Sequence, residues 1–207
     1  MEPFTLCAGI AAPLPQANVD TDVIMPKQFL KGTTRAGLAA GLFYDLRFDG
    51  NGHERAEFIL NRADYRAATF LVVGPNFGCG SSREHAVWGL RQYGVRGLIG
   101  LSYASIFYDN CIRNGLLPVV LPPEAHAGVL VACSDPASAH LTIDLEQQVI
   151  VLNDGSSASF DIDPRERDDL LHGRDAVAAT LLQAAAIDAF ERKHYASAPW
   201  LQPASPT

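Results

Sequence analysis

The pattern of apolar and polar positions divides the chain into short apolar runs separated by amphipathic segments. Residues 69–73, 98–101 and 116–121 are nearly continuous apolar runs, which is typical of strands buried on both faces. Between these runs, residues 82–93 and 103–113 place apolar side chains at helical spacing. The order strand, helix, strand, helix, strand predicts an α/β fold with a central, mostly parallel sheet and crossover helices.

The two ends of the chain add further elements to this sheet. Residues 4–14 read as another extended segment. Residues 141–152 and 158–162 flank an Asn-Asp-Gly sequence, which is the signal of a hairpin. Residues 175–195, rich in alanine and leucine, predict a long C-terminal helix.

No repeat or linker divides the chain of 207 residues, and its 48% apolar content is enough to bury a core. We expect a single domain over residues 1–198 with a glycine-containing loop excursion at about 32–60. Residues 199–207, which contain several prolines, are expected to form a disordered tail.

Charge and cysteine spacing argue against several classes of protein. A formal net charge of -7 argues against a nucleic-acid partner or an anionic membrane surface. The apolar stretch near the N-terminus is too short to span a bilayer and follows no basic region, so the expected location is the cytoplasm. The thiols are too far apart for a zinc or iron-sulfur site on this chain, so any metal would come from another chain. The cysteines are Cys7, Cys79, Cys111 and Cys133.

The segment 78–85, Gly-Cys-Gly-Ser-Ser-Arg-Glu-His, lies between a predicted strand and a predicted helix. Its glycines let the backbone approach a ligand closely, Ser81 and Ser82 add hydroxyls, and Arg83 adds a fixed cation. It lacks the lysine of a Walker loop, the third glycine of a dinucleotide fingerprint and the second glycine of a nucleophile elbow. These residue types favour a site for a small carboxylate.

Other interpretations of the same residues remain open at this point. Ser81 and Glu84 fit a helix capping box, which would contribute about 1 kcal/mol to stability without any function. The helix dipole disfavours a cation at Arg83, which is better explained by a bound anion or a paired carboxylate. His85, four residues after Ser81, could face the serine as a base, although a locally hydrogen-bonded histidine is commoner.

Three segments occur in an order that is found in one family. Segment 78–85 is preceded by Asn-Val-Asp-Thr-Asp at 18–22, and Ser-Ile-Phe begins a third segment at 105–119. Together with residues 26–30 and 41–43, they resemble the small subunit of 3-isopropylmalate dehydratase, the detached swivelling β/β/α domain of the aconitase superfamily. The resemblance covers nearly the whole chain.

The resemblance implies a hydro-lyase that isomerises 2-isopropylmalate to 3-isopropylmalate through 2-isopropylmaleate in leucine biosynthesis. The chain would act on this small dicarboxylate only with a large subunit that carries a four-iron four-sulfur cluster, and it would bind no cofactor itself. Two alternatives are a related dehydratase for homoaconitate, citraconate or a dimethylmalate, and a non-catalytic carboxylate-binding module.

The resemblance also implies roles for individual residues. Ser81 matches the serine that, as an alkoxide, removes a proton from carbon, and Arg83 matches the arginine that binds a substrate carboxylate. Ser82 would add a hydrogen bond to the substrate. Thr21 and Asp22 match the Thr-Asp of the upstream turn that helps build the same pocket.

Arg35 lies in the loop that faces the variable group of the substrate in this family. Members often have Thr-Gly-Phe-Gly there, whereas residues 36–39 of this chain are Ala-Gly-Leu-Ala. We expect the loss of the second glycine to stiffen the loop, and leucine in place of an aromatic ring to change an apolar contact.

Overall fold

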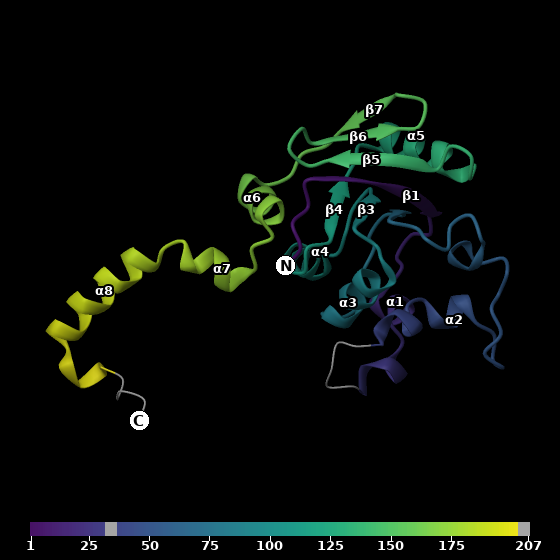
Figure 1. Ribbon diagram of the computed structural model, residues 1–207. Coiled ribbons are helices and arrows are strands. Elements are labelled where there is room, and N and C mark those ends of the chain that lie inside the picture. Colours follow the sequence, from purple (N-terminus) through teal and green to yellow (C-terminus); the bar gives the residue numbers. More distant parts are fainter. Residues whose placement is uncertain (32–36, 203–207) are drawn as a thin grey trace.

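The computed structural model describes residues 1–31 and 37–202, and within them a seven-stranded sheet forms the centre of the molecule (Figure 1). Its strand order is β4-β3-β2-β1-β5-β6-β7, with β1 to β4 parallel and the β1–β5, β5–β6 and β6–β7 pairs antiparallel. The strands are β1 (Leu6–Leu14), β2 (Phe70–Val73), β3 (Gly97–Gly100), β4 (Leu117–Val120), β5 (His140–Asp144), β6 (Val149–Leu152) and β7 (Ser157–Ser159).

Helices connect the parallel strands, as the sequence predicts. Helix α3 (Glu84–Tyr93) joins β2 to β3, α4 (Ser105–Arg113) joins β3 to β4, and α5 (Pro123–Ser134) follows β4. The parallel sheet with crossover helices is therefore confirmed, and its strands lie within two residues of the predicted ends. The other helical elements are α1 (Thr21–Ile24), η1 (Lys27–Lys31), η2 (Leu38–Gly41), α2 (Tyr44–Arg47), η3 (Ile59–Asn61), α6 (Pro164–His172), α7 (Ala176–Leu181), α8 (Ala184–Ser197) and η4 (Pro199–Leu201).

Alternate residues of the central strands enter two cores on opposite faces of the sheet. In β2, Leu71 and Val73 belong to one core, whereas Phe70 and Val72 belong to the other. Helices α3 and α4 contribute to the first core, and α5 and α6 contribute to the second. Because side chains alternate along a strand, a continuous apolar run is stable in water only when helices cover both faces.

The predicted hairpin is present, with one more turn than expected. Strands β6 and β7 pair across the Asn-Asp-Gly turn, where Gly155 has a φ of 84°. The segment 141–152 is itself two strands, β5 and β6, separated by a turn in which Gln148 has a φ of 53°. Because this turn contains neither glycine nor proline, the sequence gives little local signal for it.

The described part of the predicted excursion over 32–60 contributes to the first core. Arg47 is buried there, and its guanidinium donates to Asn61 Oδ1 at 3.2 Å and to the Leu42 carbonyl at 3.3 Å. The helical turns η2, α2 and η3 are too short to repeat an apolar spacing, which explains the poor periodicity of this stretch. Its buried apolar residues are Leu38, Leu42, Phe43 and Leu60.

The C-terminal segment extends away from the sheet as an arm (Figure 1). The predicted single helix over 175–195 is two helices, α7 and α8, because the chain turns between them at Leu182 and Gln183. Of the predicted tail 199–207, Pro199–Leu201 form η4 and residues 203–207 lie outside the described part. Among the residues described, none of the helices is both long and apolar enough to cross a membrane.

Candidate active site

The candidate site lies at the carboxyl edge of the parallel strands. Strands β1, β2 and β3 are adjacent and parallel, so the segments that follow them meet at one edge of the sheet. Thr21 follows β1, Ser81 follows β2 and Ser105 follows β3. The topology therefore brings together three predicted segments that are distant in the sequence. Isolated bridges continue this pairing beyond the strands, between Asp20 and Cys79 and between Phe77 and Tyr103.

Ser81 and Thr21 are hydrogen-bonded to each other. The Ser81 Oγ lies 2.8 Å from the Thr21 Oγ1, and the Ser81 N–H donates to the same Thr21 oxygen at 3.1 Å. The Thr21 N–H in turn donates to the Cys79 carbonyl at 2.8 Å. Because Thr21 is only 1% exposed while Ser81 is exposed, Thr21 holds the serine from the protein side.

Two glycines shape the loop that precedes Ser81. Gly78 and Gly80 have φ values of 75° and 98°, in the left-handed region that residues with a Cβ rarely adopt. A Cβ added at Gly78 would lie 2.1 Å from the Phe107 ring, and one at Gly80 would lie 3.3 Å from the Asp20 Cβ. Glycine is therefore required for the loop to pass this close to α4.

Replacing Gly78 by alanine is expected to lower the free energy of unfolding by about 2 to 4 kcal/mol, since backbone strain adds to the clash with Phe107. Gly50→Ala is the matched control, because a Cβ added there meets no atom within 4 Å. Urea unfolding of both variants measures the effect. Similar midpoints for the two variants would contradict the close packing of this loop.

Arg83 and Asp22 form an ion pair between Nη1 and Oδ1. The side chains are 21% and 46% exposed, so solvent screens the pair and its contribution to stability is small. Its main effect is to orient the guanidinium, whose remaining N–H groups stay available to a carboxylate. Of the two explanations offered for a cation at this position, the paired carboxylate is confirmed.

The helix capping box, one of the interpretations left open by the sequence, is not present. Helix α3 begins at Glu84, and its N-cap, Arg83, makes no side-chain capping hydrogen bond. The Glu84 Oε1 instead accepts a hydrogen bond from Asn114 Nδ2 at 2.7 Å. Ser81 therefore does not hold the helix end, and its hydroxyl belongs to the pocket.

His85 contacts Trp88. Its ring packs against Trp88 with a centroid separation of 4.6 Å. The side-chain partner of the Ser81 hydroxyl among the described residues is Thr21, so the alternative of a serine-histidine pair is not supported.

The first turn of α4 completes the pocket, a role that the residue pattern alone does not indicate. The N-cap of α4, Ala104, makes no side-chain capping hydrogen bond, and the helix start favours a negative charge in the pocket. The cavity measures about 80 Å³. Small-molecule sites are usually larger than roughly 300 Å³, so this cavity, as the described residues form it, is small for a complete site. The lining residues are Gly78, Gly80, Ser81, Ala104, Ser105, Ile106 and Phe107.

The remaining predicted site residues are Ser82 and Arg35. Ser82 is exposed next to Ser81 in the same loop. Arg35 lies outside the described residues.

The cysteines do not fit a metal cluster on this chain. Cys111 and Cys133 belong to the two cores on opposite faces of the sheet, so they cannot share one cluster. Burial raises the pKa of both thiols, that of Cys133 to about 12, which opposes the thiolate that a metal requires. In residues 1–31 and 37–202, no group of three His, Cys, Asp or Glu side chains is arranged to hold a metal ion.

Comparison with known proteins identifies the class of protein to which this fold and site belong. The model of the aconitase C-terminal domain family matches residues 1–124, which contain the whole candidate site. A model described as LeuD_N matches residues 132–164. A third model, for the C-terminal domain of the 3-isopropylmalate dehydratase small subunit, matches residues 177–204.

Individual relatives narrow the class further. A 3-isopropylmalate dehydratase small subunit of Mannheimia succiniciproducens is 51% identical over 98% of this chain and 100% of that protein. The small subunit of Rhodospirillum centenum is 49% identical over 97% of this chain and 98% of that protein. The crystal structure of 3-isopropylmalate dehydratase from Methanocaldococcus jannaschii has a TM-score of 0.65 at 26% identity, covering 90% of this chain and 99% of that one. The chain belongs to the 3-isopropylmalate dehydratase small-subunit family.

Proposed function

We propose that this chain is the small subunit of a heteromeric hydro-lyase that isomerises 2-isopropylmalate to 3-isopropylmalate through 2-isopropylmaleate, a step of leucine biosynthesis. Full-length similarity to small subunits of that name supports this function over the alternatives of a related dehydratase or a binding module. The observation that carries the proposal is the pairing of an exposed Ser81 with a buried Thr21, beside Arg83 held by Asp22.

Ser81 is the base in this proposal. Its alkoxide takes a proton from one substrate carbon, and the electron pair left behind forms the carbon-carbon double bond as the neighbouring carbon loses its hydroxyl. In this proposal an acid on the large subunit supplies the second proton, with which that hydroxyl leaves as water. Return of the proton and of water to exchanged carbons gives the isomer. A serine hydroxyl is a weak base, so its anion must be stabilised, and a hydrogen bond from Thr21 and the start of α4 can supply this.

Arg83 is the carboxylate clamp. Asp22 pairs with its guanidinium two residues after Ser81, so a substrate carboxylate would meet a guanidinium that is already oriented. Ser82 adds a hydrogen bond to the bound substrate. Arg35 and residues 36–39 set specificity for the variable group of the substrate.

The partner in this proposal is a large subunit that carries a four-iron four-sulfur cluster. The described cysteines of this chain do not fit such a cluster, and we assign this chain no step that involves it. The small volume of the pocket supports the need for a second chain that completes the site. We place the complex in the cytoplasm, where the four free thiols would stay reduced.

The function is tested by mixing this chain with a cluster-loaded large subunit and 2-isopropylmalate. We expect no turnover with either chain alone and formation of 3-isopropylmalate by the mixture. Chromatography that separates the two isomers measures the product. Citraconate and homoaconitate serve as competing substrates. Faster turnover of either would contradict the assignment to 2-isopropylmalate.

Thr21 is expected to act as a positioning residue, since it is buried and hydrogen-bonded to Ser81. Thr21→Val keeps the shape but removes the hydroxyl, so kcat should fall about tenfold to a hundredfold with little change in KM. Thr21→Ser keeps the hydroxyl and should restore most of the activity. Steady-state kinetics measures both, and equal losses in the two variants would indicate a purely structural role.

A further inference from the structure

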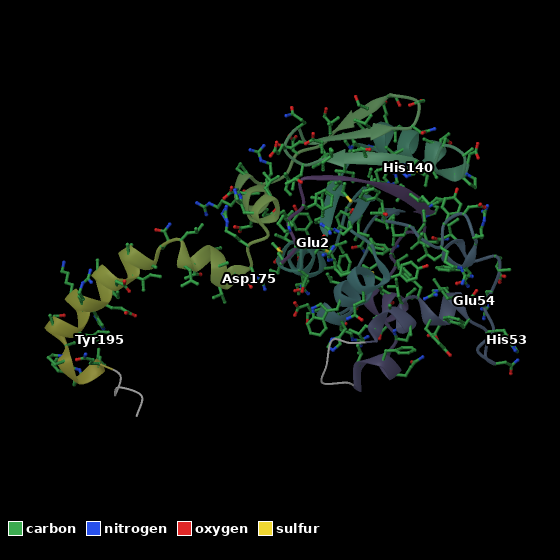
Figure 2. The ribbon with its side chains drawn as sticks, viewed as in Figure 1. Glu2, His53, Glu54, His140, Asp175 and Tyr195 are labelled. Atoms are coloured by element: carbon green, nitrogen blue, oxygen red, sulfur yellow. The ribbon has the colours of Figure 1, made fainter. Side chains whose placement is uncertain are left out.

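The C-terminal arm, defined as residues 176–202, has no buried side chain in any of its helical elements α7, α8 and η4. Figure 2 shows Asp175 at the base of the arm and Tyr195 far along it, away from the sheet. The helices of the arm therefore do not pack against an apolar surface of the rest of the chain.

The arm is rich in exposed apolar side chains. In the described part of the chain, seven of the thirteen exposed large apolar residues belong to it. In α8, Ile187, Phe190 and His194 follow one another at spacings of three and four, so they share one side of the helix. The exposed apolar residues of the arm are Val177, Leu181, Leu182, Ile187, Phe190, Trp200 and Leu201.

Short helices of this kind are marginal in water. Helices below about 12 to 15 residues gain most of their stability from packing of an apolar face. With 6 and 14 residues and nothing buried, α7 and α8 lack that contribution in the isolated chain. A concentration of exposed apolar side chains is also the usual sign of an interaction surface.

The base of the arm, in contrast, is firmly attached to the body. In α6, Leu170 is buried, and Glu166 accepts a hydrogen bond from the Tyr108 hydroxyl at 2.8 Å. The N-terminal ammonium of Met1 donates to the Gly173 carbonyl at 2.7 Å. The arm therefore leaves the domain from a fixed point.

We propose that the apolar face of this arm docks into an apolar groove on the large subunit and holds the two chains together. This inference rests on the proposed function. The aconitase C-terminal domain match ends at residue 124, whereas the match over 177–204 is to a domain described for the dehydratase small subunit. The arm thus lies where the matching model is one of a subunit, and a subunit is held to its partner by non-covalent contacts. The small volume of the pocket at Ser81 also supports a partner chain.

The docking is tested with the double variant Phe190→Ser and Trp200→Ser, which removes side chains that are 66% and 79% exposed. Val131→Ser on α5 is the matched control, because Val131 is 73% exposed outside the arm. Each variant is titrated against a fixed amount of large subunit. The concentration for half-maximal activity should rise about tenfold or more in the double variant, with the same rate at saturation, and stay within about twofold in the control.

The outcomes separate the two proposals. If the wild-type mixture gives no turnover, the proposed function fails, and sedimentation of the same mixtures still measures whether the variant weakens the complex. If the wild type is active and the double variant titrates like it, the docking proposal is overturned. Light scattering of the isolated chain tests whether the arm instead binds a second copy of this chain. If the chain self-associates through Phe190 and Trp200, and the double variant keeps its affinity for the large subunit, the docking proposal is also overturned.

Discussion

Replacing Ser81 by alanine is expected to lower kcat by about a thousandfold or more, while the complex with the large subunit still forms. The physical reason is that this change removes the group that takes the proton from carbon, and general-base catalysis contributes about a hundredfold to ten-thousandfold. Ser81 is exposed and does not cap α3, so the fold does not depend on its hydroxyl. Turnover of 2-isopropylmalate and sedimentation of the mixed chains measure the two parts of this prediction.

Ser134→Ala is the control for this experiment. Ser134 is exposed at the end of α5, and its hydroxyl donates only locally, to the Leu130 carbonyl at 2.7 Å. This variant should keep the activity of the wild type. Full activity of Ser81→Ala would exclude Ser81 as the base and would assign that role to another group of the pocket.

The second large effect is expected for Arg83→Ala, which should raise KM about a hundredfold. The loss of a bidentate contact between a guanidinium and a carboxylate removes charged hydrogen bonds worth about 1.5 to 3 kcal/mol each. Arg83→Lys should recover only part of this, because an ammonium lacks the planar fork. Asp22→Asn should have a smaller effect, since it frees the guanidinium without removing it.

Steady-state kinetics with the assembled complex measures these changes. Arg113→Ala, at the exposed C-terminal end of α4, removes the same type of side chain away from the pocket and should leave KM unchanged. An unchanged KM in Arg83→Ala would contradict the role of Arg83 as the carboxylate clamp.

The strands and crossover helices could be predicted because their signals are local. An apolar run such as residues 69–73 has to be covered on both faces wherever it lies in the fold, so it can be recognised in the sequence without knowing which strands pair with it. The turn between β5 and β6 lacked such a signal, since Gln148 adopts a left-handed conformation without glycine or asparagine.

The capping box at Ser81 and Glu84 shows where a local pattern misled. Ser81 and Glu84 have the spacing of a capping box, but each side chain is hydrogen-bonded to a residue of a distant segment. Ser81 is bonded to Thr21, and Glu84 is bonded to Asn114. These contacts arise because the segments after neighbouring parallel strands meet at one edge. The role of Ser105 at the start of α4 was missed for the same reason, although its segment was recognised as a motif.

The sequence by itself determined the strands, the crossover helices and the residue types that a carboxylate site needs, because hydrophobic spacing and glycine-rich loops act over a few residues. It also carried the resemblance that the full-length relatives confirm. Only the tertiary structure decided that Thr21 is buried beneath Ser81, that Asp22 pairs with Arg83, and that the C-terminal arm covers no part of its own core. Strand order and packing determine these features, since they join residues that are far apart in the chain.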